Sequence, residues 1–219
     1  MNYNEDSVLL AERDPRCFYE PKILICDGTF LSANEIDHYQ QLIQSYTWAP
    51  APSIKSIKYW SKDLYRHYRW DNDWDSARWL DSTPSDWVEL HTRIAARIPK
   101  HYIHWSDLKA TPPLSTGTPR HRDKDPWLKN GSDRFDCALT ICVNLNSSWQ
   151  ENWGGEFVLW AANINKVGKI NFTEYRKISI QPGQLLVLEN CWHSIAPITQ
   201  MNQSRLTFII HVLQYANQS

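Results

Sequence analysis

A histidine and an aspartate stand two residues apart in the sequence, at His121 and Asp123. In an extended strand this spacing points both side chains to the same face, so one metal ion could contact both. His193 lies far downstream, just after a strand-like run, where a neighbouring strand could present a third ligand. Two histidines and one carboxylate on one face of an octahedral ion leave three positions open for small molecules. The sequence therefore predicts a metal site at His121, Asp123 and His193.

A fourth residue, Arg205, indicates what would bind beside the metal. It lies twelve residues after His193, at the start of the last strand-like run, and Thr207 follows on the same face. A guanidinium there could hold one carboxylate of a dicarboxylate through paired hydrogen bonds, while the other end of that molecule chelates the metal. H-x-D tripeptides and strand-end arginines are each common by chance, so the prediction depends on the whole set.

The elements that must position these residues are strands. From about residue 119 onward, short apolar runs are separated by turn signals such as Gly154-Gly155 and Pro182-Gly183. Many short strands with no intervening helical pattern indicate an antiparallel barrel or jelly roll, the cupin-like architecture. The predicted strands cover residues 137–146, 156–160, 174–180, 184–188 and 206–213.

Two helices are predicted before the strands, and we expect both to pack on the outside of a sheet. The run from Ser32 to Glu35 has the form of a capping box, which predicts a helix from about 33 to 46. A second helix is expected to begin at Thr83-Pro84 and to run through Ile98, until Pro99 ends it. The aromatic stretch from about 59 to 79 has no sustained period, and we interpret it as a long loop with short ordered pieces.

The bulk composition favours a single domain. The chain has 219 residues and 42% hydrophobic content, below the length that usually forces two domains. This domain would span 1–219, with N-terminal helices and a loop over about 1–100 packed on a β core over about 101–215. Its class would be mainly β with flanking helices.

The charge and the cysteines exclude some classes of function. A net charge of -1 offers no global basic field for nucleic acid, and no run approaches the roughly 18 apolar residues of a membrane span. The N-terminus lacks a signal-peptide pattern, and the five cysteines include no C-x-x-C pair. We therefore expect a cytoplasmic protein without a nucleic-acid or membrane partner.

The ordered set of residues resembles the 2-oxoglutarate and iron(II)-dependent oxygenase superfamily, nearest its prolyl-4-hydroxylase-like branch. The resemblance covers roughly residues 119 to 213, and a weaker resemblance covers residues 27 to 45. The whole set of motifs is far more specific to this family than any one motif. In chain order the set consists of His121-x-Asp123, Leu145-Asn146 with Trp149, Gly154-Gly155-Glu156, Pro182-Gly183, His193, Pro197 and Arg205.

The resemblance implies a double-stranded β-helix fold, with iron(II) bound by His121, Asp123 and His193. It also implies that Arg205 holds the distal carboxylate of 2-oxoglutarate, and that O₂ is consumed as succinate and CO₂ are released. Asp123 favours hydroxylation, because halogenating relatives lack this carboxylate. Relatives often carry a tyrosine before the Leu-Asn pair where this chain has Val143-Asn144, so Thr207 is the candidate that assists Arg205.

The expected substrate is an amino acid, a peptide or another small molecule. Aromatic faces with positioned cations suit such a substrate, so Arg69 and Trp70 are substrate candidates, together with Arg134 and Trp153. Two alternatives stay open. One is an iron oxygenase or isomerase that needs no 2-oxoglutarate, for which Arg205 is the discriminating residue; the other is a non-catalytic cupin-like binding module, which would release no succinate.

Overall fold

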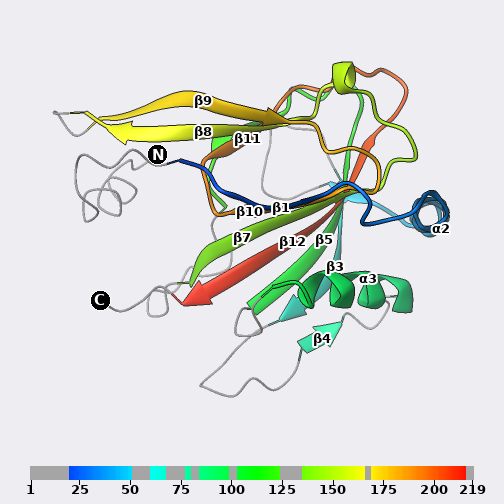
Figure 1. The fold of residues 1–219 in the computed structure, drawn as a ribbon. Coiled ribbons are helices and arrows are strands. Elements are labelled where there is room, and N and C mark those ends of the chain that lie inside the picture. The colour runs from blue at the N-terminus through cyan, green and yellow to red at the C-terminus, as the bar shows by residue number, and fades with distance from the viewer. Residues whose placement is uncertain are drawn as a thin grey trace.

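The strands of the protein form two antiparallel sheets that face each other (Figure 1). This architecture comes from a computed structural model, which describes residues 20–50, 60–67, 77–79, 84–98, 103–123, 135–165 and 169–215.

The larger sheet has eight strands in the order β1-β10-β7-β12-β5-β3-β2, with β4 paired to β3. Strand β12 is central, and its Ile209 lies opposite Cys142 of β7 on one side and Asp107 of β5 on the other. The strands are β1 (Ile23–Asp27), β2 (Ala49–Pro50), β3 (Trp60–His67), β4 (Ala77–Trp79), β5 (Ile103–Thr111), β7 (Phe135–Asn144), β10 (Leu185–Glu189) and β12 (Arg205–Tyr215).

The smaller sheet has four strands in the order β6-β11-β8-β9. They are β6 (Thr118–His121), β8 (Phe157–Ile164), β9 (Ile170–Ile178) and β11 (His193–Ile195), and the 3₁₀ turn η1 (Glu151–Trp153) precedes β8. The two facing sheets form the double-stranded β-helix that the sequence predicts.

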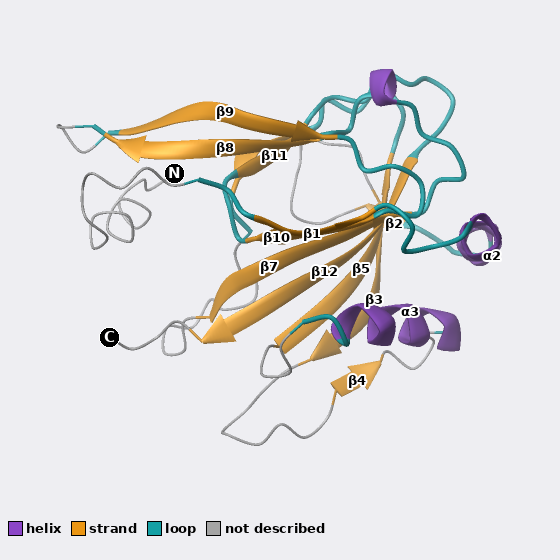
Figure 2. Ribbon diagram, in the orientation of Figure 1, coloured by secondary structure: helices purple, strands orange, loops and turns teal. Residues whose placement is uncertain are grey.

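Two α-helices cover the larger sheet on its side away from β8 and β9 (Figure 2). They are α2 (Ala33–Gln44) and α3 (Ser85–Ala95). The predicted capping box is confirmed, because the Ser32 hydroxyl accepts a hydrogen bond from the Glu35 backbone and the Glu35 carboxylate accepts one from the Ser32 backbone. In the described part of the chain, no helix is long and apolar enough to cross a membrane.

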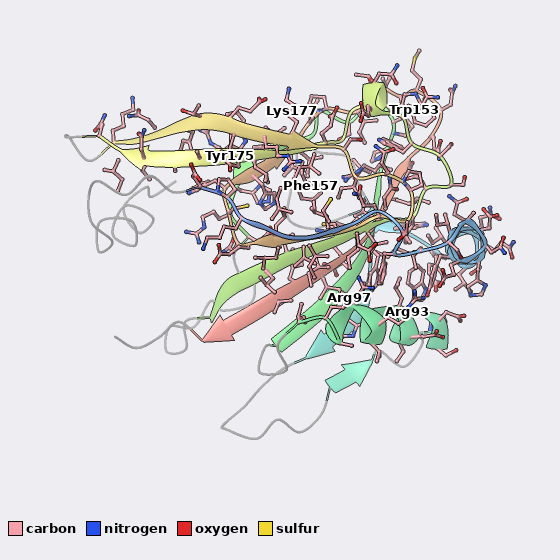
Figure 3. The ribbon with its side chains drawn as sticks, in the orientation of Figure 1. Arg93, Arg97, Trp153, Phe157, Tyr175 and Lys177 are labelled. Atoms are coloured by element: carbon pink, nitrogen blue, oxygen red, sulfur yellow. The ribbon has the colours of Figure 1, made fainter. Side chains whose placement is uncertain are left out.

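Ion pairs join the elements on this side of the molecule. Arg93 of α3 lies 2.6 Å from Glu35 of α2, and Arg97, just after α3, lies 2.7 Å from Asp27 of β1. Figure 3 shows both arginines on the α3 side of the larger sheet. These pairs are partly exposed, so we expect them to fix geometry more than to add stability.

Strand alternation gives the larger sheet two different faces. Residues of one parity pack with the helices in a core that includes Trp87, Leu90, Ile141, Phe208 and Ile210. Residues of the other parity face the smaller sheet in a second cluster that includes Cys142, Leu186, Leu188, Phe157 and Leu159. The period of two thus leaves one face of each strand free to line the interior of the barrel.

Three sequence-based expectations about the elements need correction. The stretch from 59 to 79 was expected to be a long loop with short ordered pieces, but it contains the eight-residue strand β3, which pairs with β5, as well as the short strand β4. Strands also begin earlier than residue 119, since β1, β3 and β5 complete the larger sheet. The second helix begins at Ser85 and ends at Ala95 rather than Ile98, although Ile98 is buried in the core.

Candidate active site

The structure brings His121, Asp123 and His193 together between the sheets. His121 ends β6 and lies directly opposite His193 at the start of β11, and the two ring centroids are 4.4 Å apart. One candidate ligand atom from each histidine and from Asp123 lies within 4.8 Å of the others. Two segments about seventy residues apart therefore present one compact set of metal-binding groups.

Both histidines are oriented by the backbone. His121 Nδ1 lies 2.7 Å from the Pro119 carbonyl oxygen, and His193 Nδ1 lies 3.0 Å from the Cys191 carbonyl oxygen. A carbonyl oxygen can only accept a hydrogen bond, so each Nδ1 carries the proton. The lone pair is then on Nε2 of each ring, which is the form a metal requires.

Asp123 is held by groups from the larger sheet. The Thr140 hydroxyl donates a hydrogen bond to Asp123 Oδ2, and His211 Nδ1 lies 3.7 Å from the same oxygen. The other oxygen, Oδ1, lies 3.4 Å from His121 Nε2. The carboxylate is therefore anchored through one oxygen while the other faces a candidate metal ligand.

The pKa shifts of Asp123 and His193 favour the protonation states that metal binding needs. Burial raises the pKa of Asp123, but His193, His121 and His211 outweigh it and hold that pKa well below its usual value. Burial lowers the pKa of His193. Burial also lowers the pKa of His121, but the adjacent Asp123 outweighs it and leaves this pKa raised. Asp123 is thus ionised and His193 neutral near pH 7.

Arg205 and Thr207 lie on the interior face of β12. Both are buried, and Arg205 Nη2 and Thr207 Oγ1 have no hydrogen-bond partner among the described residues. The Phe157 ring, labelled in Figure 3, is near both Arg205 and His193. Its centroid lies 5.6 Å from the Arg205 guanidinium carbon and 5.7 Å from the centroid of the His193 ring. A buried, unpaired guanidinium beside a hydroxyl fits the carboxylate of a dicarboxylate cosubstrate.

Gly155 allows Arg205 to take this position. A Cβ atom at Gly155 would lie 2.9 Å from Arg205 Cδ, and the glycine has a φ of +77°, which side-chain-bearing residues rarely adopt. The Gly-Gly signal in the sequence therefore marks a close approach of backbone to the candidate carboxylate site.

Two residues at this site were missed from the sequence, His211 and Thr140. They lie opposite each other in the β12–β7 register, and both are buried. A signal was present, because Arg205, Thr207 and His211 share the parity of one strand face. No sequence pattern indicated Thr140, because its place in the site depends on the pairing of β7 with β12.

The substrate candidates are not all placed near the three residues. Trp153 lies in η1 and packs edge-on against Trp149, with ring centroids 5.5 Å apart (Figure 3). Arg69, Trp70 and Arg134 lie outside the described residues. The strands on either side of the 68–76 segment, β3 and β4, pair with each other, and β3 also pairs with β5, where Tyr65 lies opposite Ser106.

Comparison with known proteins agrees with this geometry. Residues 114–212 match the model of the 2OG-Fe(II) oxygenase superfamily, whereas no curated protein sequence matches the chain. A prolyl-4-hydroxylase from Pseudomonas putida is 14% identical, with a TM-score of 0.53 over 88% of this chain and 92% of that one.

Two further solved structures are similar. The viral collagen prolyl hydroxylase of Paramecium bursaria Chlorella virus-1, in its 2-oxoglutarate complex, is 14% identical, with a TM-score of 0.51 over 89% of this chain and 96% of that one. HygX from Streptomyces hygroscopicus, with nickel and 2-oxoglutarate bound, is 10% identical, with a TM-score of 0.54 over 95% and 86%. At these identities the structural similarity shows a common fold.

The fold is thus that of a double-stranded β-helix oxygenase. The family match covers residues 114–212, which contain His121, Asp123, His193 and Arg205, and it indicates a 2OG-Fe(II) oxygenase. The chain is accordingly an enzyme that depends on iron(II) and 2-oxoglutarate and uses O₂.

Proposed function

We propose that this oxygenase hydroxylates an unactivated C–H bond in an amino acid, a peptidyl side chain or an amino-acid-derived molecule. In this proposal His121, Asp123 and His193 hold the iron, and Arg205 with Thr207 holds the distal carboxylate of 2-oxoglutarate. The observation that carries it is the convergence of three candidate ligand atoms within 4.8 Å, in the same barrel as a buried, unpaired guanidinium.

When bound, iron(II) allows O₂ to oxidise 2-oxoglutarate to succinate and CO₂, with one oxygen atom entering succinate and the other inserted into the substrate C–H bond as a hydroxyl group. The chain's own residues hold and orient the reactants. His121 and His193 direct Nε2 inward because their Nδ1 atoms are engaged by carbonyl groups. Thr140 keeps Asp123 in place through Oδ2.

Apolar side chains line part of the site. Phe157, Leu159, Cys142 and Ile209 line the space between the sheets near Arg205 and His193. Burial raises the pKa of Cys142 to about 12, so its thiol is neutral and acts as part of an apolar wall. Where water is excluded, the pairing of a carboxylate with Arg205 is stronger. Exclusion of water also limits side reactions during the oxidation.

The relatives support the type of substrate. Two of the three solved structures described above are prolyl hydroxylases, and one of these two is a collagen prolyl hydroxylase. This supports an amino-acid or peptidyl substrate for the present chain.

The test is to supply iron(II), 2-oxoglutarate and isotopically labelled O₂ with a panel of amino acids, peptides and cell extract. We expect substrate-dependent succinate release, with one labelled oxygen atom in succinate and one in the product. Oxidised product that forms equally well without 2-oxoglutarate would contradict the proposal. So would succinate release that no substrate stimulates.

A further inference from the structure

Strand β5 carries two opposite charges, Asp107 and Lys109, on the face that lines the barrel. In the β5–β12 register Lys109 lies opposite Thr207, and Asp107 lies opposite Ile209. Directly opposed residues of an antiparallel pair point to the same side of a sheet. Leu108, between the two charges, points the other way and is buried under the helices. Asp107 and Lys109 therefore share the interior face with the candidate cosubstrate site.

The charge of Lys109 acts on two of the candidate metal ligands. Burial is the main cause of the lowered pKa of His193 and of His211, and Lys109 lowers both pKa values further. Lys109 acts in the same direction on the pKa of His121, while Asp107 opposes the lowering at His211. Lys109 thus lies within electrostatic range of His121, His193 and His211, and Asp107 lies within range of His211.

Neither charge is paired within the described residues. Lys109 and Asp107 are each half-buried, and neither forms a hydrogen bond or ion pair with another described side chain, including each other. A partly desolvated charge without a partner is costly, and this cost is removed when a ligand supplies the opposite charge.

The cosubstrate does not need these two residues for charge balance. The positive charges of iron(II) and Arg205 are matched by the carboxylate of Asp123 and the two carboxylates of 2-oxoglutarate. Lys109 and Asp107 remain as one cation and one anion, roughly 7 Å apart along the strand. A ligand that complements both would carry a carboxylate and an ammonium close together.

We propose that Lys109 and Asp107 bind the carboxylate and the ammonium group, respectively, of a free α-amino acid, which is the primary substrate. This inference rests on the proposed function and selects one substrate class within it. A residue inside a polypeptide carries neither terminal charge, so it would leave both side chains unpaired.

The experiment compares free amino acids with their N-acetylated and C-amidated forms in substrate-stimulated succinate release. We expect the wild type to prefer a free amino acid by about tenfold to a hundredfold in kcat/KM over either blocked form, as for loss of a charge-assisted hydrogen bond. Lys109→Met should lose the preference for carboxylate over amide, and Asp107→Asn should lose the preference for free amine over N-acetyl. The KM for 2-oxoglutarate should stay unchanged in both variants.

The matched controls are Lys177→Met and Glu174→Gln, which remove an exposed ion pair of 3.7 Å on β9 (Figure 3 labels Lys177). We expect both controls to keep the wild-type preferences. A raised KM for 2-oxoglutarate in Lys109→Met would overturn the inference by assigning Lys109 to the cosubstrate. Turnover confined to peptides, with 2-oxoglutarate dependence intact, would overturn the inference alone. Absence of 2-oxoglutarate dependence in the wild type would overturn the proposed function as well.

Discussion

The two faces of the larger sheet come from the same strands but have different composition. On β12, Phe208 and Ile210 point to the helices and are completely buried among apolar side chains. Arg205, Thr207 and His211 point into the barrel and are also buried, although burial of polar groups is costly. The apolar side chains of the helix-covered face therefore stabilise the fold. This stabilisation offsets the free-energy cost of holding polar groups on the interior face.

Because neighbouring residues of one strand point to different faces, single substitutions can test the roles of the two faces separately. A substitution of a buried polar residue on the interior face should remove function with little loss of stability, and a substitution of an apolar residue on the helix-covered face should do the reverse.

Removing a candidate metal ligand should have the largest effect. We expect His193→Ala to abolish metal binding and turnover while the thermal unfolding curve of the metal-free protein changes little, because a barrel core does not depend on the ion for folding. Calorimetric titration with manganese(II) measures the binding. His38→Ala, which removes an exposed histidine of α2, is the control and should bind metal normally. Full turnover in His193→Ala would rule out this ligand.

Truncation on the helix-covered face should show the opposite pattern. Phe208 is fully buried and stacks on Trp87, with ring centroids 5.5 Å apart. Phe208→Ala should lower the free energy of unfolding by about 3 to 5 kcal/mol while manganese affinity in the folded protein stays near that of the wild type. Denaturant unfolding and metal titration of the same sample test this. A large loss of metal affinity with unchanged stability would show that the two faces are not separable.

Arg205→Ala should weaken 2-oxoglutarate binding by about 2 to 5 kcal/mol, because a buried carboxylate would lose its charged partner. Manganese binding should persist, since Arg205 is not a candidate ligand. Thr207→Val, which keeps the shape and removes the hydroxyl, should have a smaller effect in the same direction. An unchanged KM for 2-oxoglutarate in Arg205→Ala would mean that another cation holds the cosubstrate.

The smallest effect is expected at the helix cap, far from the interior face. Hydrogen bonds from the Ser32 backbone and hydroxyl, and then from Arg93, lower the pKa of Glu35 from 4.5 to about 2. Glu35 therefore stabilises the fold above about pH 4.5, and this stabilisation is lost as pH falls toward 2. Ser32→Ala should lower the free energy of unfolding by about 1 kcal/mol at pH 7.

The difference between wild type and Ser32→Ala should shrink as the pH is lowered through this range. Ser45→Ala is the control, because the Ser45 hydroxyl bonds to the Leu42 carbonyl, which does not titrate. A difference that is independent of pH for Ser32→Ala would contradict the role of Glu35.

Features encoded by adjacent residues were predictable from the sequence. The capping box from Ser32 to Glu35 is confirmed, since a few consecutive residues determine both of its hydrogen bonds. The spacing of His121 and Asp123 predicted that both could contact one metal ion, and the structure brings them together with His193, although β6 ends at His121 and Asp123 follows it. Their role as iron ligands stays a prediction.

Features that depend on distant pairing were not predictable. Strand β5 pairs with β12, about a hundred residues downstream. The residues around β5 in the sequence therefore do not indicate which strand it pairs with. His211 lies within an apolar run, where its parity with Arg205 gains meaning only once Thr140 is known to lie opposite. Local propensity carries no information on such register, which tertiary packing sets.

A crystal structure of the protein with manganese(II) and 2-oxoglutarate, using the anomalous signal of the metal, would locate both the metal ion and the cosubstrate. We predict one metal ion bound by His121 Nε2, His193 Nε2 and Asp123, with 2-oxoglutarate on the metal and its distal carboxylate paired with Arg205. A metal ion bound elsewhere, or a 2-oxoglutarate molecule that does not contact Arg205, would contradict the account.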